Sequence, residues 1–278
     1  MLTRPLGEIV ARCSRSLVHA YGRDAVVKVP EPATPGSWIL AEAEYSEAVR
    51  AVGAPAPRLL AVEKVAGRPA TVWERLDGPS MWERVVSAPG HAARMGRLLS
   101  DIQLALFELV PPVTLPSQRD RLASKIRRSA AAIDPGLARA LELLPARAGP
   151  GRLCHGDLHP SNVILRPGGP MLVDWFDASR GDRVAEVARS SLTLLADGLQ
   201  MPRHLPGADR RTLARLTDAY VARMRERLAI TPEALARWQA ISAAARVAEG
   251  VSREPLLQVW RVFDADQSAG LEAQAAAS

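Results

Sequence analysis

The chain has 278 residues, of which 47% are hydrophobic and 24% charged, so it is long enough for one two-lobed domain or two modest domains and has the composition of a folded globular protein. No apolar run reaches membrane-spanning length, the N-terminus lacks the apolar core of a signal peptide, and the two cysteines form neither a disulfide framework nor a metal-ligand pair. We therefore expect a cytoplasmic protein with no membrane partner. The net charge of +6 comes from basic residues that stand singly or in pairs, which argues against a nucleic-acid partner.

The first third of the chain predicts strands around a single helix. Residues 16–21 and 25–29 are strand-like and flank the turn sequence Gly22-Arg23-Asp24, so they predict a hairpin. A helix is expected over residues 37–52, with Ser37 as its N-cap and Gly53 at its end. Two further strands are expected over residues 58–62 and 70–73.

From residue 91 onward the apolar residues follow a helical period. Helices are expected over residues 91–109, 118–144, 184–197, 210–228, 232–250 and 255–263. The pattern predicts an α+β protein with a small β-rich lobe, residues 1–75, and a larger, mainly helical lobe, residues 76–278. The hinge between them would lie at about residues 74–78.

One segment carries most of the predicted chemistry, His155-Gly156-Asp157-Leu158-His159-Pro160-Ser161-Asn162, followed by Val173-Asp174-Trp175. A site that transfers the terminal phosphoryl group of a nucleotide needs a base for the acceptor and ligands for one or two Mg²⁺ ions. The spacing predicts Asp157 as the base and Asn162 and Asp174 as the Mg²⁺ ligands. The alternative is a loop of polar residues that merely form turns.

A cation for the nucleotide phosphates is predicted at Lys28. Only three of the 36 basic residues are lysines, and this one stands in a strand-like run where a surface charge has no evident reason to be lysine. The alternative is an edge-strand lysine that prevents aggregation. Glu42 and Glu44 are the candidates to hold the lysine in place. We favour Glu42, because large apolar residues share its helical face.

The catalytic segment resembles that of the aminoglycoside phosphotransferase and choline kinase group of small-molecule kinases. Gly156 stands where protein kinases place arginine, His159 where they place lysine, and Asp174-Trp175-Phe176 where they have Asp-Phe-Gly. Gly181-Asp182 and then Glu186-Val187-Ala188-Arg189 resemble the segment that follows in this group, although an aspartate is more usual at the position of Glu186. The likeness runs in order from Lys28 and covers about the first 190 residues.

This resemblance implies a bilobal protein kinase-like fold and an enzyme that uses ATP or GTP with Mg²⁺. The hinge backbone between Glu74 and Leu76 would bind the adenine, and Asp157 would be the catalytic base. His155 would brace the catalytic loop. Apart from the resemblance, His159 itself is open to two interpretations: a solvent-facing or loop-bracing histidine, or one that contacts phosphate.

The phosphate-binding loop departs from the expected pattern, because residues 11–16 contain no glycine. The hydroxyl groups of Ser14 or Ser16 and the backbone amides of this turn would then hold the phosphates. The departure also keeps open a second hypothesis, a pseudokinase that binds nucleotide without catalysis.

The acceptor is expected to be a hydroxylated small molecule. An aminoglycoside is a polycation and needs carboxylates around it, but residues 180–278 contain fourteen arginines against twelve acidic residues. A cluster around Asp177, Asp182, Glu186, Asp264 and Asp266 could still form an acidic site. A metabolite kinase of the choline or sugar-amine type is therefore kept as an alternative, and the sequence leaves the oligomeric state open.

Overall fold

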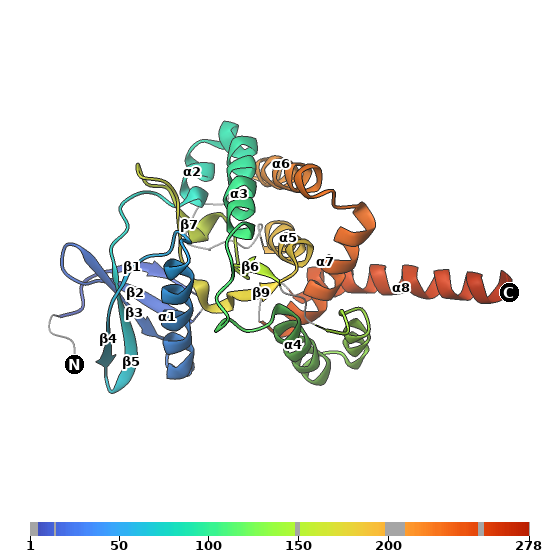
Figure 1. Cartoon of the computed structure of the whole chain (residues 1–278), viewed down its shortest axis with the longest axis horizontal. Helices are drawn as coiled ribbons and strands as arrows, with labels where there is room; N and C mark the ends of the chain where they lie inside the picture. The colour runs from blue at the N-terminus through green and yellow to red at the C-terminus, as the bar shows by residue number, and fades with distance from the viewer. Residues whose placement is uncertain (1–4, 14, 148–150, 198–208, 250–252, 278) are drawn as a thin grey trace.

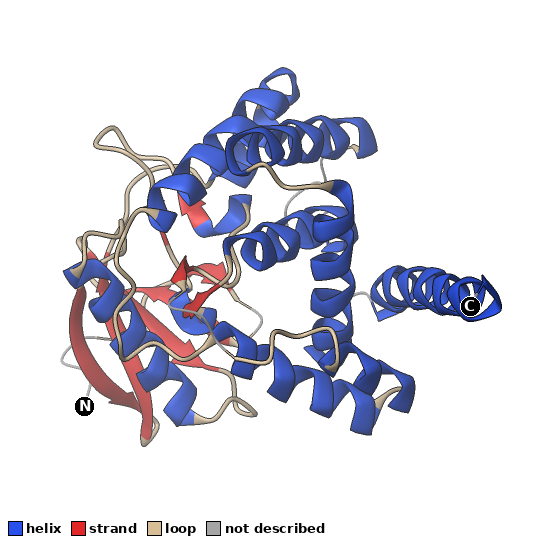
Figure 2. Cartoon of the chain, turned by 45° about the vertical axis from the view of Figure 1, so that its right-hand side comes forward, coloured by secondary structure: helices blue, strands red, loops and turns tan. Residues whose placement is uncertain are grey.

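The computed structural model describes residues 5–13, 15–147, 151–197, 209–249 and 253–277, and it places the side chains of these residues except 196–197 and 267–277. A β-rich region built from the first third of the chain lies beside a larger helical region (Figure 1). The long strands are confined to one side of the molecule, and helices make up most of the remainder (Figure 2). This arrangement confirms the predicted α+β class.

The β-rich region is one antiparallel sheet with the strand order β1-β2-β3-β5-β4. Its strands are β1 Ile9–Arg12, β2 Ser16–Ala20, β3 Ala25–Pro30, β4 Leu59–Val65 and β5 Arg68–Glu74. The predicted hairpin of β2 and β3 is confirmed. Strand β1 was not expected; it is a short edge strand whose four residues are all exposed, so it lacks the alternation by which strands are recognised.

Strands β4 and β5 are longer than expected because of the turn between them. Ala66 and Gly67 both have positive φ, +48° and +80°, which is the geometry of a two-residue turn that matches the twist of a hairpin. The ladder therefore continues up to the pair Val65 and Arg68. Both strands reach the turn instead of stopping at the predicted residues 62 and 70.

Helix α1, Gly36–Ala51, covers one face of the sheet and ends before Gly53, as predicted (Figure 1). The predicted N-cap is wrong: Pro35 occupies the cap position and Ser37 is already the second residue of the helix. A proline preceded by two more prolines fixes an extended entry without any side-chain cap. The buried face of the helix carries Ile39, Glu42, Ala43, Ser46 and Val49.

The helical region contains both expected and unexpected elements. The remaining α-helices are α2 Met81–Ser87, α3 Ala92–Phe107, α4 Gln118–Ala132, α5 Arg183–Leu192, α6 Arg210–Leu228, α7 Pro232–Arg246 and α8 Arg253–Ala277. The 3₁₀ turns are η1 Pro89–His91, η2 Pro135–Leu141, η3 Pro160–Asn162, η4 Trp175–Asp177 and η6 Val247–Glu249, and η5 Thr193–Asp197 is a π-turn. The short strands β6 Arg152–Cys154 and β9 Ser179–Gly181 pair with each other, as do β7 Val163–Ile164 and β8 Met171–Leu172.

Two helix predictions need correction. The single helix expected over residues 118–144 is wrong, because α4 ends at Ala132 and Asp134 starts a separate 3₁₀ turn in which Pro135 is the first residue. Helix α2 was missed, although Ser80 and Glu83 form a capping box at its start. The helix predicted over residues 210–228 matches α6.

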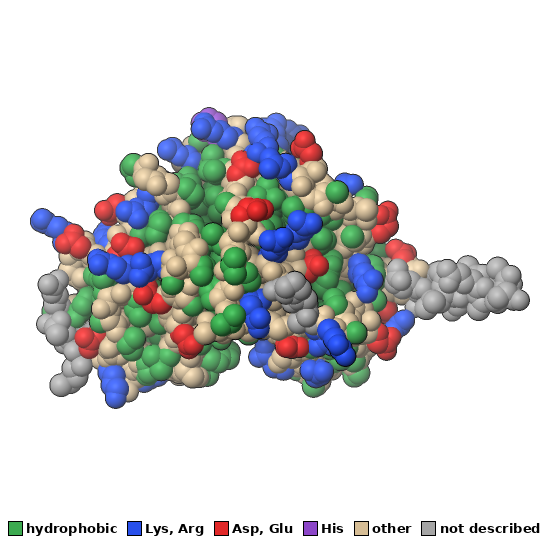
Figure 3. All heavy atoms as spheres, viewed as in Figure 1, with side chains coloured by type: hydrophobic (Ala, Val, Ile, Leu, Met, Phe, Trp, Pro, Cys, Tyr) green, Lys and Arg blue, Asp and Glu red, His purple; other side chains and the backbone are tan. Residues whose placement is uncertain are grey.

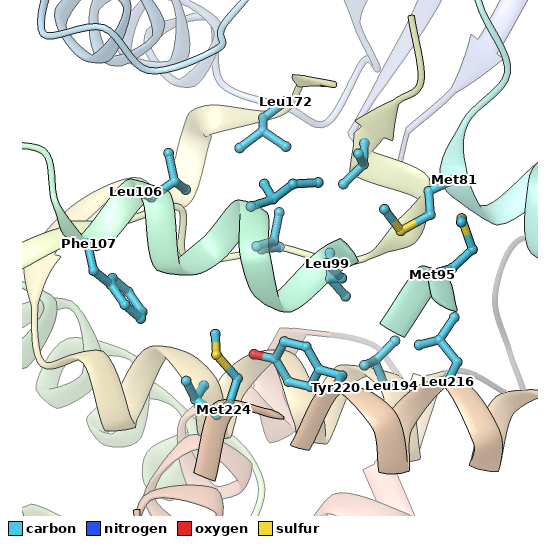
Figure 4. Packing of buried hydrophobic residues seen from close by; sticks show 14 of the residues in the cluster. Met81, Met95, Leu99, Leu106, Phe107, Leu172, Leu194, Leu216, Tyr220 and Met224 are labelled. Atoms are coloured by element: carbon cyan, nitrogen blue, oxygen red, sulfur yellow. The ribbon is translucent and has the colours of Figure 1, made fainter. Parts of the chain in front are cut away.

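The largest apolar core lies where α3 packs along α6 (Figure 4). Leu99 and Met95 of α3 face Leu216 and Tyr220 of α6. The helices approach so closely that a Cβ on Gly96 would lie 2.2 Å from the carbonyl oxygen of Leu216. A second core joins α4, α7 and α8.

None of the helices in the described parts of the chain combines the length and the apolar character needed to cross a bilayer. On the face drawn in Figure 3, basic side chains are scattered among acidic and apolar ones.

Candidate active site

The catalytic segment runs from the end of β6 through η3 to β7, and the β7–β8 hairpin returns the chain to Asp174. Backbone bonds hold this path: Asn162 N donates to His159 O at 2.9 Å, and Val173 N donates to Asn162 O at 3.0 Å. The structure thus brings together the segments that carry Asp157, Asn162 and Asp174.

Asp157 lies in an environment that keeps its carboxylate ionised. Its Oδ1 accepts a hydrogen bond from Arg189 Nη2 at 3.2 Å, and His159 Nε2 lies 3.7 Å from its Oδ2. Burial by itself raises the pKa of Asp157, but the imidazole of His159 and the positive charges of Arg189 and Arg246 outweigh burial and hold this pKa well below the usual range. The side chain is 30% exposed, so a substrate can reach it.

His155 is fully buried and bonded on both ring nitrogens. Nε2 donates to Val173 O at 3.1 Å, and Nδ1 accepts from the amide of Asp157 at 3.3 Å, an arrangement that requires the neutral imidazole. Burial lowers the pKa of His155 to about 4. The ring also lies 4.5 Å from that of Trp175. These contacts tie the loop to the strand that precedes Asp174.

Gly156 allows the catalytic loop to approach η4. Its φ is +79°, and a Cβ there would lie 2.1 Å from Asp177 O, so no other residue fits without displacing the backbone. Two side chains of α5 bind the backbone of Gly156. Glu186 Oε1 accepts from Gly156 N at 2.9 Å, and Arg189 Nε donates to Gly156 O. Burial raises the pKa of Glu186 to about 6.

Arg189 and Glu186 are the functional residues whose roles the sequence did not reveal. The sequence indicated them as part of a resembling segment, and Glu186 also as a member of a possible acidic cluster, whereas the structure places both against the catalytic loop. Their spacing of three along a helix was a usable signal, because such residues share a face. Nothing in the sequence alone says that this face meets Gly156.

Asn162 and Asp174, the predicted Mg²⁺ ligands, lie at the two ends of the β7–β8 excursion. Asn162 Nδ2 donates to Asp157 O at 2.9 Å, so the amide oxygen, the atom that a hard cation prefers, is not the one committed to this bond. Asp174 has the left-handed conformation, φ +67°, which presents its carboxylate beside Lys28 Nζ at 3.3 Å. These residue types fit Mg²⁺, which takes few protein oxygens and completes its shell with phosphate and water.

Lys28 is held between two carboxylates. It projects from β3, and its Nζ lies 2.6 and 2.7 Å from the two oxygens of Glu42, whereas Glu44 is exposed. Burial by itself lowers the pKa of Lys28, but the charges of Asp174 and Glu42 outweigh burial and raise it, so the ammonium stays charged. Of the two candidate glutamates, Glu42 therefore makes the ion pair.

The loop between β1 and β2 lies over Lys28, but only part of it is described. Ser14 lies outside the described residues. Ser16 is buried, and its Oγ makes no hydrogen bond to a nitrogen or oxygen of the described residues. The space that Ser16 lines beside Lys28 and Asp174 holds about 30 Å³, room for about one water. Arg15 and Trp38 also line this space, and the Arg15 guanidinium lies 5.0 Å from the ring centroid of Trp38.

The predicted hinge residues differ in their free hydrogen-bonding groups. Glu74 is the last residue of β5, and its amide donates to Arg58 O at 3.1 Å, while the next amide, that of Arg75, donates to Asp24 O at 2.9 Å. Within the described residues the amide of Leu76 has no backbone acceptor. Of residues 74–76, the span predicted to bind the adenine, Leu76 is thus the one whose amide has no backbone acceptor among the described residues.

A β-rich region with a buried lysine–glutamate pair, joined to a helical region whose His-Gly-Asp loop faces a second aspartate, defines a kinase-like phosphotransferase. The chain belongs to the phosphotransferase enzyme family, whose model matches residues 14–202, more than half of its length. A comparison with curated proteins finds no match.

Solved structures of several phosphotransferases have the same fold. A thermostable mutant of the aminoglycoside phosphotransferase APH(4)-Ia is 14% identical with a TM-score of 0.62, covering 94% of this chain and 95% of its own. The aminoglycoside phosphotransferase APH(3'')-Id of Streptomyces rimosus is 20% identical with a TM-score of 0.59, covering 86% and 92%. A choline/ethanolamine kinase family protein of Mesorhizobium loti is 16% identical with a TM-score of 0.52, covering 95% and 88%. These likenesses confirm the predicted bilobal kinase-like fold.

Proposed function

We propose that the protein transfers the γ-phosphoryl group of ATP or GTP to a hydroxyl group of a small molecule. The observation that carries this proposal is the contact of Lys28 with both Glu42 and Asp174, since Lys28 and Asp174 are 146 residues apart and come from different regions of the fold. A bound nucleotide requires a cation for its phosphates and a carboxylate for its metal ion, and here the two groups lie side by side.

Each residue of the site then has a role in the transfer. Asp157 accepts the proton of the acceptor hydroxyl, whose oxygen forms the new bond to the γ-phosphorus. The bond from phosphorus to the bridging oxygen breaks, and the nucleoside diphosphate leaves with that electron pair. Lys28 neutralises the phosphates, and Asn162 and Asp174 would hold Mg²⁺. When bound, Mg²⁺ offsets the charge of the phosphate oxygens.

Contacts to the nucleotide are proposed for two groups that have no nitrogen or oxygen partner among the described residues, one of which, the Ser16 hydroxyl, contacts the thiol of Cys13. The amide of Leu76 would donate to the base, and the buried hydroxyl of Ser16 would donate to a phosphate oxygen. Support for a nucleotide comes from two structural neighbours, an APH(4)-Ia variant with AMP-PNP and hygromycin B and an aminoglycoside 2'-phosphotransferase-IIIa with GDP.

The variant Asp157→Ala tests the proposal. Loss of a positioned base should lower kcat by roughly 10² to 10⁴ while the affinity for Mg²⁺–ATP, measured by calorimetry, changes little. Glu44→Gln, at an exposed position of α1, is the matched control and should behave as wild type. Near-full activity of Asp157→Ala would exclude Asp157 as the base.

The absence of glycine from residues 11–16 favours one alternative, a pseudokinase that binds nucleotide without catalysis. Binding of Mg²⁺–ATP without turnover of any hydroxylated compound would support the pseudokinase, whereas turnover that depends on Asp157 supports the enzyme.

A further inference from the structure

A second and larger cavity, of about 370 Å³, lies where Arg15 and Trp38 of the β-rich region meet the helical region. Its volume falls within the range of small-molecule sites. The charged groups that line it are Arg15, Arg121, Lys125, Arg128, Asp177 and Glu249, so four cationic side chains face two carboxylates. Trp38 and Phe176, whose rings lie 5.3 Å apart, add an apolar wall.

Both carboxylates are already neutralised by several cations. Asp177 lies 3.2 Å from Arg121, 3.0 Å from Lys125 and 3.3 Å from Arg189. Glu249 lies 2.7 Å from Lys125, 3.2 Å from Arg246 and 3.7 Å from Arg189. A polycationic ligand would therefore have to displace buried cations before it gained a carboxylate partner.

Two of the cavity's cations, Arg15 and Arg128, form no ion pair within the described residues. The charge of Arg15 does act on Glu42, a carboxylate that Lys28 already binds. Arg15 lies over Trp38 and Phe176, at 5.0 and 5.1 Å from the ring centroids, and Arg128 projects from the exposed side of α4. A free guanidinium presents a planar pair of donors suited to a carboxylate or phosphate group.

Asp177, which lines the cavity, also lies beside the catalytic loop. The backbone of Asp177 lies against Gly156, and Arg189 Nη2 bridges Asp157 Oδ1 at 3.2 Å and Asp177 Oδ2 at 3.3 Å. The cations of α4 line this cavity and not the space beside Lys28, whereas Arg15 lines both.

The other acidic residues that could have formed an acidic pocket lie elsewhere. Asp182 caps α5, Glu186 binds the amide of Gly156, and Asp264 pairs with Arg139. Asp266 is exposed on α8 and does not line the cavity. Of the five candidates only Asp177 contributes to it.

We infer that this cavity binds the acceptor and that the acceptor is an anionic hydroxylated small molecule, with a carboxylate or phosphate group held by Arg15 and Arg128. This inference rests on the proposed phosphotransferase function. The anionic group anchors the molecule while its hydroxyl oxygen takes the γ-phosphoryl group, the hydroxyl proton passes to Asp157, and the nucleoside diphosphate leaves.

A set of acceptors that differ mainly in charge tests the inference. ATP consumption is measured with glucosamine, glucose, gluconate and glucose 6-phosphate as the matched core of a wider panel of cationic, neutral and anionic hydroxyl compounds, with kanamycin as a polycation. Turnover should be found in the anionic class. Gluconate against glucose 6-phosphate separates a carboxylate from a phosphate anchor. Turnover confined to cationic or neutral compounds overturns the inference and leaves the phosphotransferase function standing.

Variants of α4 provide the second measurement. With the best anionic acceptor, Arg128→Gln should raise KM about tenfold with little change in kcat, because it removes one charge-assisted bond. The control Arg127→Gln, exposed on the same helix but outside the cavity, should change neither constant. Equal KM values for the two variants contradict the assignment. If Mg²⁺–ATP binds but no class of acceptor turns over, the proposed function itself fails, and this inference fails with it.

Discussion

His155 couples the stability of the catalytic loop to pH. Its pKa is lowered to about 4 in the fold from an ordinary value of 6.5, so its contribution to stability is complete above pH 6.5 and is lost as the pH falls toward 4. At full extent this difference is worth about 3 kcal/mol. Glu186 makes stability depend on pH in the opposite direction. Its pKa rises to about 6 in the fold, so its contribution to stability is complete below pH 4.5 and is lost as the pH rises through 6.

The variant His155→Asn should therefore change the slope of stability against pH. Without nucleotide or Mg²⁺, the free energy of unfolding of the wild type should fall slightly from pH 7 to pH 5, whereas that of the variant should rise. Over this range the two changes should differ by about 2 kcal/mol. Urea unfolding at pH 7, 6 and 5 measures it. The exposed His91→Gln serves as control. Parallel curves for wild type and His155→Asn would contradict a neutral, buried His155.

Some of the site's residues were detectable one at a time from composition. Lysine is rare in this chain, and two of the three lysines, Lys28 and Lys125, form buried or half-buried ion pairs, while Lys64 is exposed. The same signal that drew attention to Lys28 would have drawn it to Lys125. Which carboxylate each lysine meets could not be read this way, because the partners of Lys125 come from η4 and η6.

At the level of elements, the contact of α3 with α6 depends on the absence of a side chain at Gly96. The polar groups of this interface are also paired: Ser100 Oγ lies 3.1 Å from Tyr220 O, and the Tyr220 hydroxyl donates to Gln103. Where the backbones of α3 and α6 lie this close in a buried interface, there is no space for an added methyl group.

Gly96→Ala should therefore destabilise the protein, although alanine is the better helix former by about 1 kcal/mol. We expect a loss of about 2 kcal/mol in the free energy of unfolding, because the new Cβ would lie 2.2 Å from Leu216 O and would push the helices apart. The midpoint of urea unfolding checks this. Gly90→Ala, where no atom lies within 4 Å of the new Cβ, should be nearly neutral. A stabilised Gly96→Ala variant would mean that α3 and α6 can separate freely.

At the scale of the whole molecule, the β-rich region depends on the helical region. Its own apolar cluster has four buried members, Tyr21, Val27, Ala70 and Val72, whereas Val49 of α1 belongs to the large core of the helical region. Helix α1 also packs against η4, directly after Asp174. The division at about residues 74–78 thus separates two regions that share a core, and it stays a prediction as a domain boundary.

A fragment of residues 1–75 should consequently not fold by itself, because so few buried apolar side chains cannot offset the chain entropy of 75 residues. Its amide NMR spectrum should be poorly dispersed, and the complete chain should unfold in a single transition. A well-dispersed fragment spectrum, or two transitions in the complete chain, would indicate two independent domains.

The sequence by itself determined the order and spacing of the residues that carry the chemistry. The β-then-helical pattern and the loop that carries Asp157, Asn162 and Asp174 are local features, set by turn formers and by residues near one another in the chain. Even so, the predictions omitted β1 and α2 and joined α4 to η2, because short or exposed elements show only a weak periodicity of apolar residues.

Only the tertiary structure decided which side chains meet. It selected Glu42 over Glu44 for Lys28, brought Arg189 of α5 to Asp157, and surrounded Asp177 with cations. These pairings follow from burial and from contacts between segments far apart in the chain, which the periodicity of a single segment does not encode. The charge of the larger cavity, and with it the inferred anionic acceptor, therefore emerged only from the fold.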